Sequence, residues 1–171
     1  IAESLMAYQG WSSNRAASFD KAAEAARRAG QLDSGDPWSH FTRGNRCSTG
    51  KAVSRSLAAL TRAAELHPNF ALAHSRLGVT LTYVGRAEEG IEHTGRALRI
   101  SPRDPLKAAL LNSHAIALFG ASRYDELILA AERASQARYG YAQALRFLVA
   151  SRALTGDLKG ARGALEDLQS A

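Results

Sequence analysis

Apolar residues recur along the chain at the spacing of amphipathic helices, and the helices come in pairs. Near the middle of the chain, Leu77 and Leu81 lie one turn apart on the same face of a first helix, and Gly85 interrupts that helix. A second helix begins at Ala87 and ends before Pro102. Because residues four apart share a helix face, and because glycine and proline end helices, this pattern predicts a helical hairpin.

The hairpin pattern is repeated at a fixed interval. Gly10, Gly44 and Gly78 are 34 residues apart (44 − 10 and 78 − 44). Two further sets of residues keep the same interval, one of alanines and one of helix terminators: Ala29, Ala63 and Ala97, then Ser34, Pro68 and Pro102. A hairpin cannot bury its apolar face alone, and stacked copies of about 34 residues build one continuous core. The sequence therefore predicts an all-α array of tandem hairpins.

The copy at 69–102 resembles a tetratricopeptide (TPR) repeat. The residues that carry the resemblance stand where that family places Leu, Gly, Ala and Pro: Leu77, Gly78, Ala97 and Pro102. The family's Trp, Tyr, middle Ala and Phe are replaced here, in that order, by His74, Leu81, Gly90 and Thr94. The resemblance implies a TPR-like right-handed α-solenoid of antiparallel helix hairpins, about four or five repeats long.

Extending this register gives approximate repeats over the whole chain, the first of them degenerate: 2–34, 35–68, 69–102, 105–138 and 139–171. The register slips by three residues after Pro102, because Arg103, Asp104 and Pro105 lengthen the connection. We expect a single domain. Ile1 in place of Met, and a final helix without a polar cap, suggest a fragment of a larger protein.

Composition changes this picture little. Hydrophobic residues make up 46% of the chain, which suits closely packed helices, and no apolar stretch reaches the length of about 18 residues that spans a membrane. No signal peptide is recognisable at the N-terminus, so we expect a cytoplasmic protein. The single cysteine, Cys47, excludes an intrachain disulfide, and its repeat position indicates a buried spacer rather than a nucleophile.

The net charge of +6 raises the question of an anionic partner. The arginines fall mainly on second helices, where they alternate with glutamates as on a solvated outer face. The residues concerned are Arg27, Arg28, Arg62, Arg96, Arg99, Arg133 and Arg162, with Glu24, Glu65, Glu92 and Glu132. This distribution argues against nucleic acid and favours an acidic protein surface, or solubility alone, as the reason for the excess charge.

No motif predicts an enzyme, a metal site or a cofactor. The string 44–51 resembles a phosphate-binding P-loop, but Asn45 occupies a glycine position and Ala52 replaces the Ser or Thr that would hold magnesium. His40 and His74 are 34 residues apart (74 − 40), so we expect them at equivalent positions of neighbouring repeats rather than around one metal ion.

The TPR resemblance also implies a binding face, because the first helices of such arrays line a concave groove. The family's groove positions correspond here to Trp38, Phe41, Asn45, Ser75, Val79, Tyr83, Asn112, Phe119 and Arg146. Aromatic anchors, amides and an arginine suit a peptide or helix laid in the groove. The alternative is that Trp38 and Phe41 only pack between repeats.

Two narrower resemblances bear on the partner. The carboxylate clamp with which some TPR domains bind chaperone tails is incomplete, because Phe41, Ala109 and Ser113 occupy clamp positions. The run 66–126 is instead similar to the TPR region behind the catalytic domain of bacterial class III adenylate cyclases, and behind some winged-helix transcription regulators. This resemblance implies a non-catalytic regulatory or docking arm of a bacterial signalling protein.

The last helix suggests a second function class. It carries an apolar stripe at helical spacing: Leu158, Ala161, Leu165 and Leu168. Because a terminal repeat needs a polar outer face, the stripe predicts self-association into a homodimer, or coverage by residues outside this sequence. The sequence thus leaves open an interaction module and a self-association platform.

Overall fold

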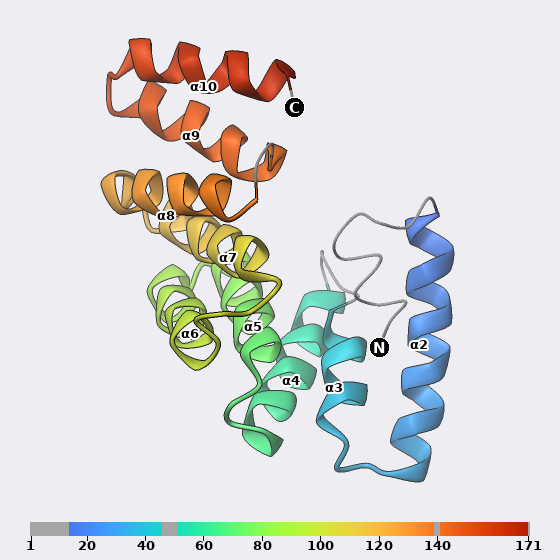
Figure 1. The fold of residues 1–171 in the computed structure, drawn as a ribbon. Helices are drawn as coiled ribbons and strands as arrows, with labels where there is room; N and C mark the ends of the chain where they lie inside the picture. Colours follow the sequence, from blue (N-terminus) through green and yellow to red (C-terminus); the bar gives the residue numbers. More distant parts are fainter. Residues whose placement is uncertain (1–13, 46–50, 139–140, 171) are drawn as a thin grey trace.

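The computed structural model describes residues 14–45, 51–138 and 141–170. In those ranges all regular secondary structure is α-helical, and the helices are α2 (Arg15–Leu32), α3 (Pro37–Gly44), α4 (Lys51–Leu66), α5 (Ala71–Tyr83), α6 (Ala87–Ile100), α7 (Lys107–Gly120), α8 (Tyr124–Ala137), α9 (Ala142–Leu154) and α10 (Leu158–Ser170). They form a curved stack that runs from α2 at one end to α10 at the other (Figure 1). The all-α solenoid expected from the sequence is confirmed.

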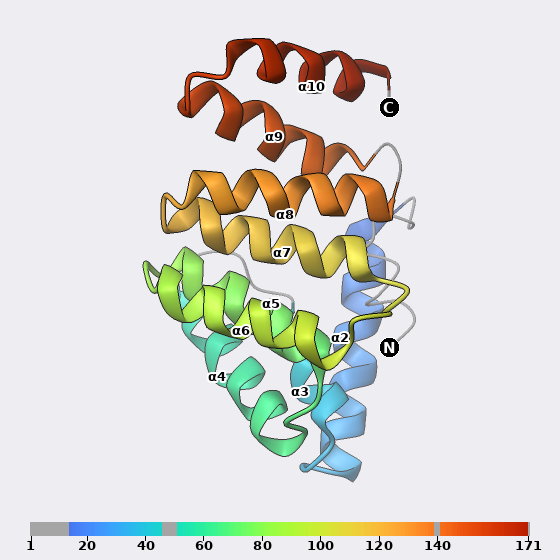
Figure 2. The same ribbon diagram turned by 60° about the vertical axis from the view of Figure 1, so that its left-hand side comes forward.

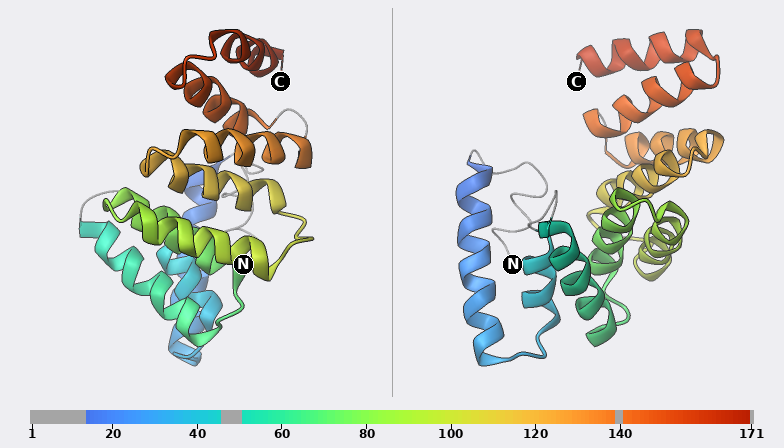
Figure 3. Two further views of the ribbon diagram at one scale, coloured as in Figure 1. Left: turned by 90° about the vertical axis from the view of Figure 1, so that its left-hand side faces the viewer. Right: turned by 180° about the vertical axis from the view of Figure 1, so that it is seen from behind.

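In the middle of the stack, a first helix packs against the helix that follows it and against a helix of the next hairpin. Thus α5 packs against α4, α6 and α7, and α7 packs against α6, α8 and α9. Figure 2 shows α6, α8 and α10 following one another along the stack. At the opposite end α2 lies beside α3, as the rear view in Figure 3 makes clear. The expected first helix of repeat 2–34 falls mainly outside the described residues.

Local sequence explains where the first described helices begin. The Asn14 side-chain oxygen accepts a hydrogen bond from the backbone N–H of Ala17 at 3.0 Å. The Asp36 carboxylate accepts one from the N–H of Ser39 at 2.8 Å. Pro37 then fits the first turn of α3, where its missing N–H leaves no hydrogen bond unmade.

The turns between the two helices of three hairpins share one backbone feature, a residue with a positive φ angle. Gly85 and Gly156 have positive φ angles of 83° and 86°, and Ser122 occupies the corresponding turn between α7 and α8 with a φ of 58°. Glycine adopts this left-handed conformation without steric cost, whereas a residue with a Cβ does so with strain. The spacing of the turns is therefore regular even where the residue is not glycine.

The three-residue slip in the register is accommodated by a compact turn between α6 and α7. The Asp104 carboxylate accepts hydrogen bonds from the Ser101 hydroxyl and from the backbone N–H of Leu106, both at 2.8 Å. The extra residues are accommodated in this turn, which leads directly into α7.

The hairpin α5/α6 is packed through its glycines. A Cβ placed on Gly78 would lie 2.6 Å from the Gly90 carbonyl oxygen, and one on Gly90 would lie 2.7 Å from the Gly78 carbonyl oxygen. Thr94 is fully buried at the same contact, with its methyl group 2.6 Å from the Gly78 Cβ position. The two departures from the TPR pattern at Gly90 and Thr94 therefore belong together, because both make room for a close approach of the two helices.

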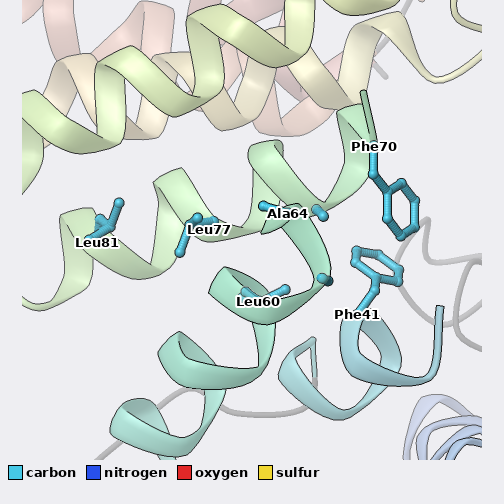
Figure 4. Packing of buried hydrophobic residues seen from close by; sticks show 8 residues of the cluster. Phe41, Leu60, Ala64, Phe70, Leu77 and Leu81 are labelled. Carbon is cyan, nitrogen blue, oxygen red and sulfur yellow. The ribbon is translucent and has the colours of Figure 1, made fainter. Parts of the chain in front are cut away.

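A hydrophobic cluster joins α3, α4 and α5 and contains the aromatic residues of the second repeat. Phe41 and Phe70 lie with ring centroids 5.3 Å apart, and the Trp38 ring lies 4.4 Å from Phe70. Figure 4 shows the two phenylalanine rings facing one another, with Leu60 and Leu77 in the same cluster. Aromatic burial of this kind stabilises the contact between successive hairpins.

Within the part of the chain that the structure describes, no helix has both the length and the apolar character needed to cross a membrane.

Candidate functional site

Most of the residues expected in the groove are covered by their neighbours. Phe41 is only 2% exposed and Trp38 packs edge-on against it, with ring centroids 5.8 Å apart. Ser75, Val79 and Asn45 are buried as well. The alternative interpretation of Trp38 and Phe41, as packing residues between repeats, describes their surroundings in the structure. A partner cannot reach Phe41, Ser75 or Val79 without opening the array.

Asn112 is also buried, but it contributes to a polar link between two first helices. Its side-chain amide donates a hydrogen bond to the Gln143 side-chain oxygen at 3.1 Å. The Tyr141 hydroxyl donates to the same oxygen at 3.1 Å. The link ties α7 to the start of α9, so the role that the structure gives to Asn112 is to hold these two helices in register.

The remaining expected groove residues are accessible. Tyr83 is 62% exposed at the end of α5, Phe119 is 40% exposed near the end of α7, and Arg146 is exposed on α9. Phe119 also touches the next repeat, because its ring centroid lies 5.9 Å from that of Phe147.

These exposed residues lie on three successive first helices, α5, α7 and α9. A Cβ on Gly120 would lie 2.4 Å from the Thr82 methyl group, so the ends of α5 and α7 are in direct contact beside Tyr83 and Phe119. Phe147 then connects α7 to α9. We call the surface formed by Tyr83, Phe119, Arg146 and Phe147 the aromatic strip.

Reasoning from the sequence missed one member of the strip and one exposed neighbour of it. Phe147 is half-buried and carries the strip onto α9, and Val84, which lies next to Tyr83, is 42% exposed. Phe147 directly follows an expected groove residue, so its aromatic character was a usable signal. Val84 follows the last residue of α5, and a register built on helix positions alone gives no reason to select it.

The histidines explain how this chain replaces the tryptophan of the TPR pattern. His74 Nε2 lies 3.0 Å from the Pro68 carbonyl oxygen, and His40 Nε2 lies 3.0 Å from the Ser34 carbonyl oxygen. A carbonyl oxygen only accepts, so each imidazole donates its Nε2–H. The two histidines hold the connections between repeats in equivalent ways, as expected from their spacing.

The His74 ring also contacts the ring of a second histidine, His93. Its Nδ1 lies 3.0 Å from His93 Nδ1, and the two rings are stacked. Because His74 donates through Nε2, a neutral His74 accepts at Nδ1 and His93 is the donor. Further along, His114 Nδ1 is 2.8 Å from the Thr94 hydroxyl oxygen.

Burial is the main cause that lowers the pKa of all three imidazoles, His74, His93 and His114, and nearby arginines lower these pKa values further. The neutral forms that this hydrogen-bond pattern needs are therefore favoured.

Some of the charged residues expected on the outer face form ion pairs with one another. Glu24 contacts Arg27 and Arg28 at 2.7 and 3.0 Å, and Glu65 lies 3.3 Å from Arg62. These side chains are largely exposed, so water and salt screen each pair and its contribution to stability is small. The alternation of charge noted in the sequence thus corresponds to solvated helix surfaces.

The apolar stripe on α10 is divided between packing and exposure. Ala161 is buried, and Leu168 packs against the cluster that α10 forms with α8 and α9. Leu158 and Leu165 are 61% and 42% exposed. The stripe expected for self-association is therefore reduced to two accessible leucines, because the other two members face the hairpin's own first helix.

The structure gives little further information on the chemical roles considered for Cys47, for the P-loop-like string and for metal ligands. Cys47 and residues 46–50 of the P-loop-like string lie outside the described residues, and the segment before them is the helix α3, not a strand. Among the residues that are described, no group of three or more histidine, cysteine or acidic side chains could hold a metal ion.

No protein-family model matches the sequence, and no curated protein matches it. Solved structures of several helical-repeat proteins are similar in fold. PilW, a type IV pilus biogenesis factor, matches with a TM-score of 0.81 and 17% identity over 99% of this chain and 76% of that chain. MamA from Desulfovibrio magneticus RS-1 matches with a TM-score of 0.73 and 16% identity over 98% of this chain and 94% of that chain.

A third similar structure is YrrB, described as a TPR protein with an unusual peptide-binding site. It matches with a TM-score of 0.68 and 20% identity over 86% of this chain and 75% of that chain. At these identities the likeness is one of fold. The chain has the fold of TPR arrays, which agrees with the resemblance seen in its sequence.

Proposed function

We propose that this chain is a non-catalytic protein-binding module and that the aromatic strip holds a segment of a partner protein. The observation that carries the proposal is the exposure of Tyr83 and Phe119 on a surface that continues onto α9. The similarity in fold to YrrB, a TPR protein with a peptide-binding site, supports the same class of function.

The chemistry of the strip suits a peptide or a helix. Aromatic side chains bury a large area at low cost in conformational entropy, and they dominate the binding energy of many interfaces. Arg146 beside them supplies a charge that selects acidic residues in the partner. The part-buried Asn112–Gln143 hydrogen bond keeps α7 and α9 fixed, so this part of the strip is preorganised and little ordering is needed on binding.

The proposal has a finer form, in which the module is a docking arm of a bacterial signalling protein such as an adenylate cyclase. Its support is the sequence resemblance of the run 66–126. The effector region of a winged-helix regulator is the corresponding alternative. Mass spectrometry of the intact native protein tests both, because a polypeptide without a cyclase or winged-helix domain contradicts them.

Self-association is a second candidate function, and the exposed Leu158 and Leu165 on α10 favour it. Light scattering after size exclusion separates the two. A dimer that becomes a monomer in Leu158→Glu/Leu165→Glu, but not in Leu129→Glu on α8, supports this function. An unchanged mass in the double variant contradicts it.

The binding proposal is tested by affinity capture with three forms of the protein. The wild type and a Leu129→Ala control, which removes an exposed leucine from a second helix, are expected to retain the same partner. The variant Tyr83→Ala/Phe119→Ala is expected to lose it while keeping its helical circular dichroism. Retention of the partner by the double variant would falsify the role of the aromatic strip.

A further inference from the structure

Among the hollows lined by described residues, three can be compared, and they differ in charge. One of about 690 Å³ is lined from α2, α3 and α4, one of about 580 Å³ from α4, α5 and α6, and one of about 500 Å³ from α6 and α7. All fall in the range of volumes typical of sites for small molecules. Their lining residues decide which of them is suited to a ligand.

The first hollow combines three arginines with a floor of small residues. Arg27, Arg43 and Arg55 come from three different helices, and no carboxylate is among the described residues that line the hollow. Ala23, Ala26 and Ala59 leave the floor open. We call this site the arginine hollow.

Two of its arginines have no acidic partner among the residues that the structure describes. Arg43 and Arg55 are exposed, and neither forms an ion pair with any residue in the described ranges. Arg27 pairs with Glu24, but that single carboxylate also binds Arg28. Positive charge is therefore in excess around the hollow, and an anion that enters it relieves the repulsion.

The other two hollows provide an internal comparison. In the hollow between α4 and α6, Arg86 is paired with Glu89 at 2.6 Å and Arg96 donates to the Pro68 carbonyl oxygen at 3.1 Å. In the hollow between α6 and α7, Glu92 lines the same space as Arg99. Of the three, the arginine hollow is the one whose lining includes no carboxylate.

We infer that the arginine hollow binds the diphosphate group of a small phosphorylated molecule. A guanidinium presents a planar fork of N–H donors that matches phosphate oxygens, and a diphosphate offers enough oxygens to engage several forks at once. The volume of about 690 Å³ leaves room for an organic group against the alanine floor. This inference concerns a different surface from the aromatic strip and does not depend on the proposed function.

Calorimetric titration of the whole chain in low salt with EDTA tests the inference, using inorganic pyrophosphate and adenosine diphosphate as probes. We expect saturable binding of at least one probe to one site per chain, weakened tenfold or more in Arg43→Gln/Arg55→Gln. The matched control Arg96→Gln/Arg99→Gln, which removes two arginines from the other hollows, is expected to keep the affinity within about twofold of the wild type, because these residues lie outside the site.

The two probes also distinguish the sources of the diphosphate. Tighter binding of adenosine diphosphate supports an organic ligand whose ring contacts the alanine floor, and equal or tighter binding of pyrophosphate supports the inorganic group. The inference is overturned if neither probe binds saturably, or if both pairs of variants weaken binding equally. An oligoglutamate peptide is titrated in the same way, and binding of this peptide alone also overturns the inference. Circular dichroism confirms that each variant is folded before it is titrated.

Discussion

The middle hairpin α5/α6 and the last hairpin α9/α10 have the same architecture but differ in how their residues are covered. Thr94 on α6 is fully buried, whereas Leu165, at the equivalent position of α10, is 42% exposed. In the middle hairpin, α7 packs on both α5 and α6. Within the described residues no helix packs on the outer side of α10. Burial at this position therefore depends on the next repeat, through His114, as well as on the contact with Gly78 inside the hairpin.

The two hairpins also differ in how closely their helices approach. Gly78 and Gly90 let α5 and α6 meet through their backbones, whereas Val149 occupies the position of Gly78 in α9. The contact in the middle hairpin has no free space for a side chain. A change of one residue there should have a larger effect than any similar change in the last hairpin.

The largest expected effect is that of Gly78→Val. The new side chain would collide with the Gly90 carbonyl group, and we expect a loss of about 3 kcal/mol or more in the free energy of unfolding. The control is Gly163→Ala on α10, where a Cβ meets nothing within 4 Å and where alanine should stabilise the helix by up to about 1 kcal/mol. Urea unfolding measures both. Equal changes in the free energy of unfolding for the two variants would contradict the difference in packing between the two hairpins.

The next effect compares two leucines of the same two hairpins. Leu77→Ala removes a buried side chain from the cluster of Phe41 and Leu60, and we expect a loss of about 2–5 kcal/mol. Leu165→Ala removes a partly exposed one, and we expect less than about 1 kcal/mol. A loss at Leu165 as large as that at Leu77, measured at dilutions where the protein is monomeric, would mean that α10 is covered in solution.

The histidines of the middle repeats should make stability depend on pH. The pKa values of His74 and His114 lie below their usual value of 6.5 in the folded state, chiefly because burial disfavours the charged ring. Above that value both states are neutral and stability is full. As the pH falls through 6.5 towards the lowered pKa values of the folded state, the unfolded chain takes up protons that the folded chain does not, so stability declines.

Replacing both histidines tests this account. His74→Gln/His114→Gln should lower stability at pH 7 but flatten the decline towards pH 5, as measured by thermal unfolding at a series of pH values. Glutamine keeps a donor for the Pro68 carbonyl group without a titratable ring. Parallel pH profiles for the variant and the wild type would exclude these histidines as the cause.

The smallest expected effect lies in the turns. Ser122→Gly relieves a positive φ angle that glycine tolerates, and we expect a gain of about 1 kcal/mol. Gly85→Ala in the middle hairpin should cost about the same, because a Cβ there is strained although it meets no neighbour. Melting temperatures that move in the same direction for both variants would contradict the shared turn geometry.

The sequence predicted the array because its spacing is a local property. Gly44, Gly78 and the terminators Pro68 and Pro102 mark turns and close contacts that each hairpin must have, whatever packs on it. The three-residue slip was visible for the same reason.

The candidate site was harder to predict because exposure depends on neighbours far away in the sequence. The repeat register treats Val79 and Tyr83 alike, yet one is buried under the adjoining helices and the other is exposed at the end of α5. In the same way, Arg43 and Arg55 lie on different helices, and their convergence on one hollow becomes visible only once α2, α3 and α4 are packed together.

The central claim is that the aromatic strip holds a segment of another protein. It is tested most directly by placing a photo-activated benzoylphenylalanine at position 83, at position 119 or, as a control, at position 129, in the cells that produce the protein. We predict one protein partner cross-linked from positions 83 and 119 and absent from position 129. The same products from all three positions, or a partner cross-linked only from position 129, would contradict the claim.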